Sequence, residues 1–208
     1  MLHIYITAFE PYDEWDENAS WLALVEFTKT LPPNAKITTR RYPVDFPAVR
    51  ERLSRDLEED FDYALHLGQA PGSANIRLES IGLNVGGSSA EQPDALIPLV
   101  SDGPVAFRSE LPLGDWSAQL RSAGIPATVS YHAGTYLCNA TLYLSHYFTQ
   151  RKRLRTKVAF IHVPLATSQA ATSRKEIATL STSLAATGLR LIVDDLIKRE
   201  RAGVQVLS

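Results

Sequence analysis

Short apolar runs alternate with amphipathic stretches along most of this 208-residue chain. The runs have the length and the β-branched and aromatic content of buried strands, whereas the stretches between them repeat apolar side chains at helical spacing. This alternation indicates an α/β fold, a three-layer α/β/α sandwich in which helices cover both faces of a twisted, mostly parallel sheet. The expected strands are 2–8, 36–42, 63–67, 76–85, 127–131 and 157–163, and the expected helices are 20–31, 47–59, 116–123, 138–150 and about 173–199.

Length and composition fit a single domain over residues 1–208, because 45% hydrophobic content in a chain of this length is enough for a sizeable core. One long loop is expected at 86–109, where the chain carries Gly-Gly-Ser-Ser, further prolines and glycines, and no periodicity. Loops of this length are often lids over a site. A surface excursion without a function is an equally open interpretation.

Charge and cysteine content exclude several classes of partner. A formal net charge of −2 provides no positive field for gathering phosphates, so nucleic acid is a poor candidate. The first residues lack a basic segment followed by a long apolar one, and no apolar run is long enough to span a bilayer, so we expect no membrane partner and a cytoplasmic location. A single cysteine fits a reducing compartment, and five scattered histidines show no ligand spacing. No metal or other cofactor is expected.

The one cysteine, Cys138, lies in the segment 133–140 (AGTYLCNA), where a turn of small residues precedes an expected helix. Backbone N–H groups at the start of a helix favour negative charge, so they would stabilise a thiolate and receive a developing oxyanion. Cys138 is therefore a candidate nucleophile. On burial statistics alone, a buried and inert cysteine is the alternative.

Two further residues could complete a catalytic site with Cys138. His162 ends the apolar run 157–163, and Glu79 lies among apolar residues of the expected strand 76–85, where a carboxylate needs a partner. A thiol, an imidazole and a carboxylate form the set of a cysteine hydrolase: the nucleophile, the base that takes its proton, and the group that orients the imidazole. His132, close to Cys138 in the chain, is the alternative base.

Four blocks occur along the chain in a fixed order: TAFEPY at 7–12, HLGQA at 66–70, GTYLCN at 134–139 and FIHVP at 160–164. With these blocks the chain resembles the pyroglutamyl-peptidase I family, the pyrrolidone-carboxylate peptidases, over nearly its whole length. In that family a Glu, a Cys and a His follow one another in similar blocks, and they match Glu79, Cys138 and His162.

The resemblance implies a cysteine peptidase that removes an N-terminal pyroglutamyl residue from peptides through a thioester on Cys138. A catalytically silent relative that binds peptides or small ligands in the same cleft is the alternative. The resemblance also implies a homo-oligomer, a dimer or a tetramer.

The pyroglutamyl ring is a neutral lactam, so its pocket should combine apolar walls with a few fixed donors and acceptors. By resemblance, Phe9, Tyr12, Tyr136 and Leu137 match residues that wall this pocket, and Gln69 matches a residue near the polar edge of the lactam. Without the resemblance, Phe9 and Tyr12 are equally well explained as a hydrophobic plug under a loop.

The chain departs from the family pattern in two segments. Residues 12–17 (YDEWDE) are bulkier and more acidic than the Phe-Gly-Gly that usually follows Glu-Pro, so the rim of the pocket should be altered. Residues 86–91 (GGSSAE) contain no arginine, although the family typically has one near the active site at this point. If that cation supports the oxyanion, this chain must depend more on backbone N–H groups at Cys138, and a weaker or differently selective enzyme follows.

Overall fold

The central sheet has six strands in the order β2-β1-β3-β8-β4-β7. The computed structural model describes residues 1–87, 95–171, 173 and 176–206, with only the backbone described for 203–206. Neighbouring strands are parallel except for β4 and β8, which are antiparallel. The predicted mostly parallel sheet is thus confirmed. Its strands are β1 (Leu2–Phe9), β2 (Ala35–Tyr42), β3 (Tyr63–Gln69), β4 (Ile76–Glu79), β7 (Ala127–Ser130) and β8 (Lys157–Val163).

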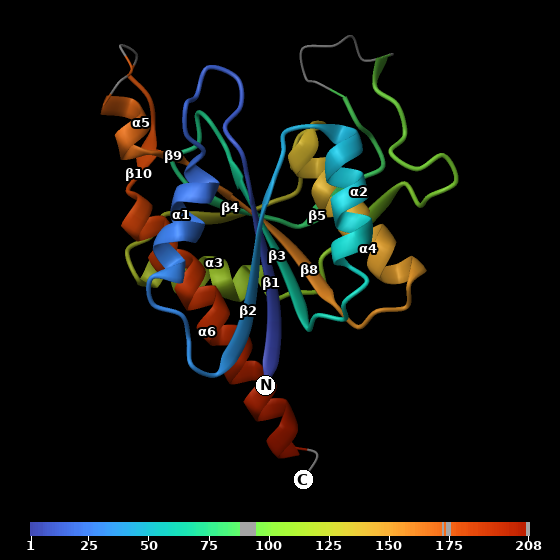
Figure 1. Cartoon of the computed structure of the whole chain (residues 1–208). Helices are drawn as coiled ribbons and strands as arrows, with labels where there is room; N and C mark the ends of the chain where they lie inside the picture. The colour runs from blue at the N-terminus through green and yellow to red at the C-terminus, as the bar shows by residue number, and fades with distance from the viewer. Residues whose placement is uncertain (88–94, 172, 174–175, 207–208) are drawn as a thin grey trace.

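Helices cover both faces of the sheet, which gives the expected three layers (Figure 1). Capping side chains mark two helix starts: Asn18 accepts from the N–H of Ser20, and Asp45 accepts from the N–H of Ala48. Within the described ranges, no helix has both the length and the apolar content needed to cross a membrane. One face carries α1 (Ala19–Thr28), α3 (Leu113–Ser122) and α6 (Thr182–Val206), and the other carries α2 (Phe46–Asp56) and α4 (Leu137–Arg151).

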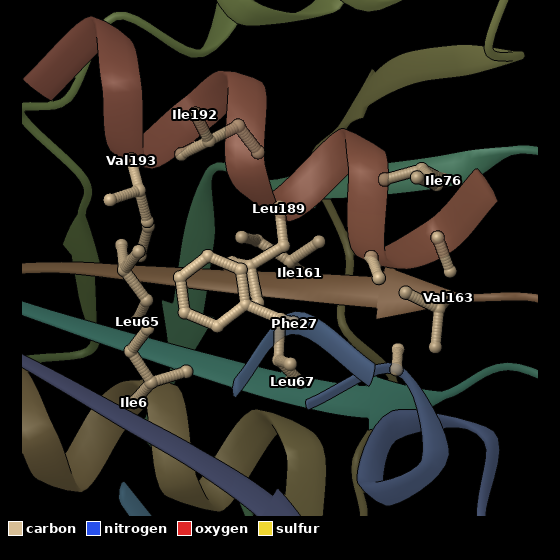
Figure 2. Close-up of a cluster of buried hydrophobic side chains, with 14 of the residues drawn as sticks. Ile6, Phe27, Leu65, Leu67, Ile76, Ile161, Val163, Leu189, Ile192 and Val193 are labelled. Carbon is tan, nitrogen blue, oxygen red and sulfur yellow. The ribbon is translucent and has the colours of Figure 1, made fainter. Parts of the chain in front are cut away.

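A hydrophobic cluster lies between the sheet and the face formed by α1, α3 and α6. Figure 2 shows Phe27 of α1 and Leu189 of α6 pointing at strand residues such as Ile161. A second cluster lies under α2 and α4 and contains Phe160 of β8. Because adjacent side chains of a strand point to opposite faces, Phe160 and Ile161 belong to different clusters. The strands are buried on both sides, which explains their continuous apolar runs.

Truncating Phe27 to alanine is expected to lower the free energy of unfolding by about 3–5 kcal/mol, because its ring is 2% exposed and fills the cluster between α1 and α6. Denaturant unfolding would measure the loss. The matched control is Val25→Ala on the same helix, where the side chain is 39% exposed and the expected change is within about 0.5 kcal/mol. Equal losses in the two variants would contradict this assignment of the core.

The strand expected at 76–85 is divided, which corrects the prediction. After β4 the N–H of Ser80 donates to the carbonyl of Ser130, and the chain leaves the central sheet to form β5 (Ile81–Leu83). Gly82 allows β5 to pass close to α4, since a Cβ there would lie 2.9 Å from the backbone nitrogen of Tyr143. A continuous apolar pattern cannot reveal a change of partner sheet.

The expected loop at 86–109 is also corrected, because it includes β6 (Ala106–Arg108), which pairs antiparallel with β5. Asn84 holds the segment between them: its Oδ1 accepts from Val100 N–H, and its Nδ2 donates to the carbonyls of Val100 and Gly103. Residues 88–94 of the expected loop lie outside the described residues. Three-residue strands are too short for their periodicity to be recognised in a sequence.

The long helix expected from about 173 begins later, at Thr182. Before it come α5 (Thr167–Ala171) and β10 (Thr179–Leu180), which pairs in parallel with β9 (Leu165–Ala166). Residues 172, 174 and 175 of the expected helix lie outside the described residues. The carboxyl ends of β1, β3 and β8 meet at one edge of the sheet, and the chain after β8 returns over this edge through β9 and α5 (Figure 1). Open α/β sheets bind ligands at such an edge.

Candidate active site

A cleft of about 1080 Å³ opens at the carboxyl edge of the sheet. Its floor and walls come from the ends of β1, β3 and β8 and from the first turn of α4. The residues that line the cleft include Phe9, Tyr12, Gln69, Cys138 and His162. Segments far apart in the sequence therefore meet at the place that the strand order predicts for a ligand.

Cys138 is the second residue of α4 and is partly buried in the cleft. The N-cap residue, Tyr136, has an extended backbone, and its side chain makes no capping hydrogen bond. The first N–H groups of a helix have no partner within the helix, so they remain available beside the sulfur. The helix start thus supplies both the nucleophile and donors for an oxyanion.

Gly68 on β3 makes room for the sulfur. A Cβ at Gly68 would lie 2.9 Å from Cys138 Sγ and 2.7 Å from the Phe160 ring. Gly68 is also the register partner of His162 on β8. The sulfur therefore reaches the sheet next to His162 only because this strand position has no side chain.

Replacing Gly68 by alanine is expected to lower kcat/KM about 100-fold, because the added methyl displaces the sulfur from its position beside His162. Steady-state kinetics on a pyroglutamyl anilide would measure it. Gly114→Ala on α3 is the matched control, since a Cβ there meets no atom within 4 Å. Activity of the Gly68 variant equal to that of the control would contradict the close approach.

His162 and Glu79 form a buried pair across the antiparallel junction of β8 and β4. The Nδ1 of His162 lies 2.8 Å from Oε1 of Glu79, and their exposed fractions are 7% and 0%. In the register Arg77 faces His162 and Glu79 faces Phe160, so Glu79 is the diagonal neighbour of His162 on the same face of the sheet. The carboxylate holds the ring with Nε2 free for another partner.

The environment of His162 favours the imidazolium. Burial lowers the pKa of His162, but the charges and hydrogen bonds of Cys138 and Glu79 outweigh it and raise the pKa from 6.5 to about 9. The imidazole thus interacts with the sulfur of Cys138 and is hydrogen-bonded to the carboxylate of Glu79. Sulfur, imidazole and carboxylate lie in one row, in the order that acyl transfer from a cysteine requires.

Asn139 joins the cysteine helix to the chain that follows Glu79. Its Oδ1 accepts from Leu83 N–H, and its Nδ2 donates to the carbonyls of Leu83 and Val85. The side chain is completely buried, so all of these bonds are made away from water. Asn139 therefore holds α4 and β5 in one position relative to each other.

The residues expected to wall the pocket all lie in the cleft. Phe9 and Leu137 are buried, whereas the Tyr136 ring is partly exposed and packs edge-on against Phe46. Tyr12 is half-buried; burial first, and then the charge of Cys138, raise the pKa of its hydroxyl to about 12. The cleft therefore has largely aromatic and aliphatic walls near the sulfur.

Gln69 is the polar group set into these walls, at the end of β3 and 4% exposed. Its Oε1 accepts from the N–H of Ala19, and its buried Nε2 makes no well-aligned hydrogen bond within the described part of the chain. The Tyr12 hydroxyl lies close enough for Gln69 to oppose the rise in the tyrosine pKa. An amide N–H thus faces the cleft.

Two other histidines have different positions. His132, the alternative base, lies at the exposed rim of the cleft, where its Nδ1 accepts from Gly134 N–H. His66 is a buried core residue, hydrogen-bonded to Thr7 and Ser145; burial is the main reason that its pKa falls to about 3. Across the described ranges, no three His, Cys, Asp or Glu side chains cluster as metal ligands would.

Arg77 is a cleft residue that the sequence reasoning missed. It lines the cleft two residues before Glu79 on β4 and directly opposite His162. A period of two places it on the same face as Glu79, so the spacing offered a signal. In the segment 86–91, which lacks the arginine typical of the family, only residues 86 and 87 are among the described residues. The cleft nevertheless contains a guanidinium, from another strand.

Comparisons with known proteins show the family of this chain. The family model described as pyroglutamyl peptidase matches residues 2–199. The chain belongs to the pyroglutamyl peptidase family. A pyrrolidone-carboxylate peptidase of Clavibacter michiganensis is 37% identical over 174 residues, which are 80% of each chain. Residues 2–199, which the family model matches, include the six strands of the central sheet and the cleft residues described above.

Solved structures of the pyroglutamyl peptidase family have the same fold. The pyrrolidone carboxyl peptidase of Fervidobacterium islandicum superposes with a TM-score of 0.88 at 29% identity, covering 95% of this chain and 99% of that one. The enzyme from Thermococcus litoralis gives a TM-score of 0.85 at 29% identity, covering 96% of both chains. The resemblance first seen in four sequence blocks therefore extends over the whole fold.

Proposed function

We propose that this protein is a cysteine peptidase that hydrolyses the N-terminal pyroglutamyl residue from peptides, with Cys138 as nucleophile, His162 as acid and base, and Glu79 as the group that orients His162. The observation that carries the proposal is the buried row in which His162 contacts both Cys138 and, at 2.8 Å, Glu79. The complete set of three side chains argues against the silent relative as an alternative. Membership of the pyroglutamyl peptidase family supports the substrate class.

The reaction proceeds as ordinary acyl transfer. The thiolate of Cys138 attacks the pyroglutamyl carbonyl, and N–H groups at the start of α4 receive the oxyanion. The His162 imidazolium then protonates the leaving amine as the C–N bond breaks, which leaves a thioester on Cys138. Neutral His162 next takes a proton from water, the resulting hydroxide attacks the thioester, and the thiolate leaves with pyroglutamate released. Protons balance over the cycle, and no cofactor enters it.

The neutral pyroglutamyl ring fits the cleft walls. Phe9, Tyr12, Tyr136 and Leu137 provide apolar surface near the sulfur, and Gln69 provides a buried N–H for the lactam carbonyl. None of these five side chains carries a charge, so binding of a neutral ring would not remove a charged group from water. We extend the proposal to a cytoplasmic location, supported by the single cysteine, and to a homo-oligomer, which sedimentation would test.

The test compares pyroglutamyl anilide with prolyl anilide, which has the same ring without the carbonyl. We expect the purified protein to release aniline from the first substrate and not from the second. Added hydroxylamine should divert the thioester to pyroglutamyl hydroxamate, which detects the acyl-enzyme directly. The absence of aniline release from pyroglutamyl anilide at high enzyme concentration would contradict the proposal.

A further inference from the structure

Two donors determine which way the Gln69 amide points. The N–H of Ala19 lies 2.7 Å from Gln69 Oε1, and Nε2 of Gln169 lies 2.9 Å from the same oxygen. Because an amide oxygen accepts and an amide nitrogen donates, this end of the group must be the oxygen. The Nε2 end is left buried in the cleft wall without a well-aligned partner in the described ranges. This N–H is therefore available to an acceptor on a ligand that enters the cleft.

Gln169, on α5, is itself held in a single orientation. Its Nε2 donates to the carbonyl of Glu17 as well as to Gln69, and its Oε1 accepts from Ala166 N–H at 2.8 Å. Turning the amide over would place oxygen against two acceptors and nitrogen against a donor. The side chain is 5% exposed, so water cannot compensate for such mismatches. Gln169 thus presents an N–H donor to Gln69, which keeps Oε1 of Gln69 on this side.

We propose that Gln169 is a positioning residue that selects the lactam: it orients Gln69 so that the cleft presents an N–H donor to the ring carbonyl. This inference rests on the proposed function and deepens it. A ring with a methylene in place of the carbonyl leaves the buried N–H of Gln69 unpaired, and a site of this kind rejects such analogues strongly. Gln169 touches no reacting atom and acts through Gln69.

The test measures binding by calorimetry in Cys138→Ser protein, so that no ligand is consumed. The ligands are pyroglutamide and cyclopentanecarboxamide, whose ring has neither the lactam N–H nor the carbonyl. In Gln169→Glu the introduced carboxylate faces Gln69 Oε1, repels it and attracts Nε2 away from the cleft. We expect the Kd of pyroglutamide to rise about tenfold, the cost of one hydrogen bond, and the Kd of cyclopentanecarboxamide to stay unchanged.

The pH dependence and a double variant distinguish positioning from simple support of the fold. The loss in Gln169→Glu should shrink as the pH falls, because a protonated carboxyl can again donate to Gln69. Gln169→Leu has no titrating group, so its loss of affinity for pyroglutamide should not vary with pH. This variant replaces Gln169→Glu in the test if the glutamate variant does not fold. In a Gln69→Leu background, Gln169→Glu should have no further effect on pyroglutamide.

Two results would overturn the inference: equal weakening of both ligands, or additive losses in the double variant. Neither depends on turnover. A native protein that releases no aniline but shows the expected binding pattern would contradict the proposed function and leave the positioning role intact. Normal turnover together with additive losses in the double variant would support the proposed function and contradict the positioning role of Gln169.

Discussion

Cys138→Ser is expected to lower kcat/KM for pyroglutamyl anilide by at least about four orders of magnitude, which is the usual scale for loss of a nucleophile from a catalytic set. Serine is nearly the same size and can occupy the space over Gly68. Its hydroxyl does not ionise beside the His162 imidazolium as a thiol does, so the first bond to the substrate no longer forms readily. Steady-state kinetics at high enzyme concentration would measure the remaining rate.

Binding and stability provide the controls for the serine variant. The melting temperature and the Kd of pyroglutamide should match the native protein, because the walls of the cleft and Gln69 are untouched. An activity above about one per cent of native, from protein free of native contamination, would show that another residue attacks the substrate.

Glu79→Gln is expected to lower kcat/KM about 1000-fold and to move the alkaline limb of the pH profile to lower pH. Glu79 raises the pKa of His162, so without the carboxylate the pKa falls below about 9. Because His162 must be protonated to act as the acid for the leaving amine, the active form is then lost at a lower pH. The amide can still accept from Nδ1, which separates the loss of charge from the loss of orientation.

The pH profile of kcat/KM, followed from neutral to strongly alkaline pH, checks the direction of this shift. Glu10→Gln is the matched control: Glu10 lies in the segment that follows β1, and it is not among the groups that affect His162. Its profile should coincide with that of the native protein. An alkaline limb that stays in place in Glu79→Gln would mean that the carboxylate does not support the imidazolium.

Residue type and sequence context were sufficient to propose Cys138, His162 and Glu79 as candidates, and the family resemblance favoured them over the alternatives. Each carries a signal that is local: a thiol at a helix start, an imidazole at a strand end, and a carboxylate in an apolar run. Gly68, Asn139 and Gln169 carry no comparable signal, because glycine and amides have many uses. Their contributions become visible only through the atoms that lie next to them, such as the sulfur over Gly68.

Strand order explains why the contact between His162 and Glu79 could not be located from sequence. His162 and Glu79 are 83 residues apart, and their contact depends on β4 being inserted antiparallel between β8 and β7. A pattern of apolar residues predicts that a strand exists and which of its faces are buried, but it does not identify the neighbouring strand in the sheet. The same limit explains the missed break between β4 and β5.

The amino-acid sequence alone was enough to establish an alternating α/β architecture, buried strands and a family likeness. These follow from periodicity and from short motifs, each of which lies within one segment. The folded arrangement added the contact of His162 with Glu79, Arg77 in the cleft and the paired amides of Gln69 and Gln169. These depend on register and on contacts between distant segments, where a shift of one residue turns a side chain to the opposite face of the sheet.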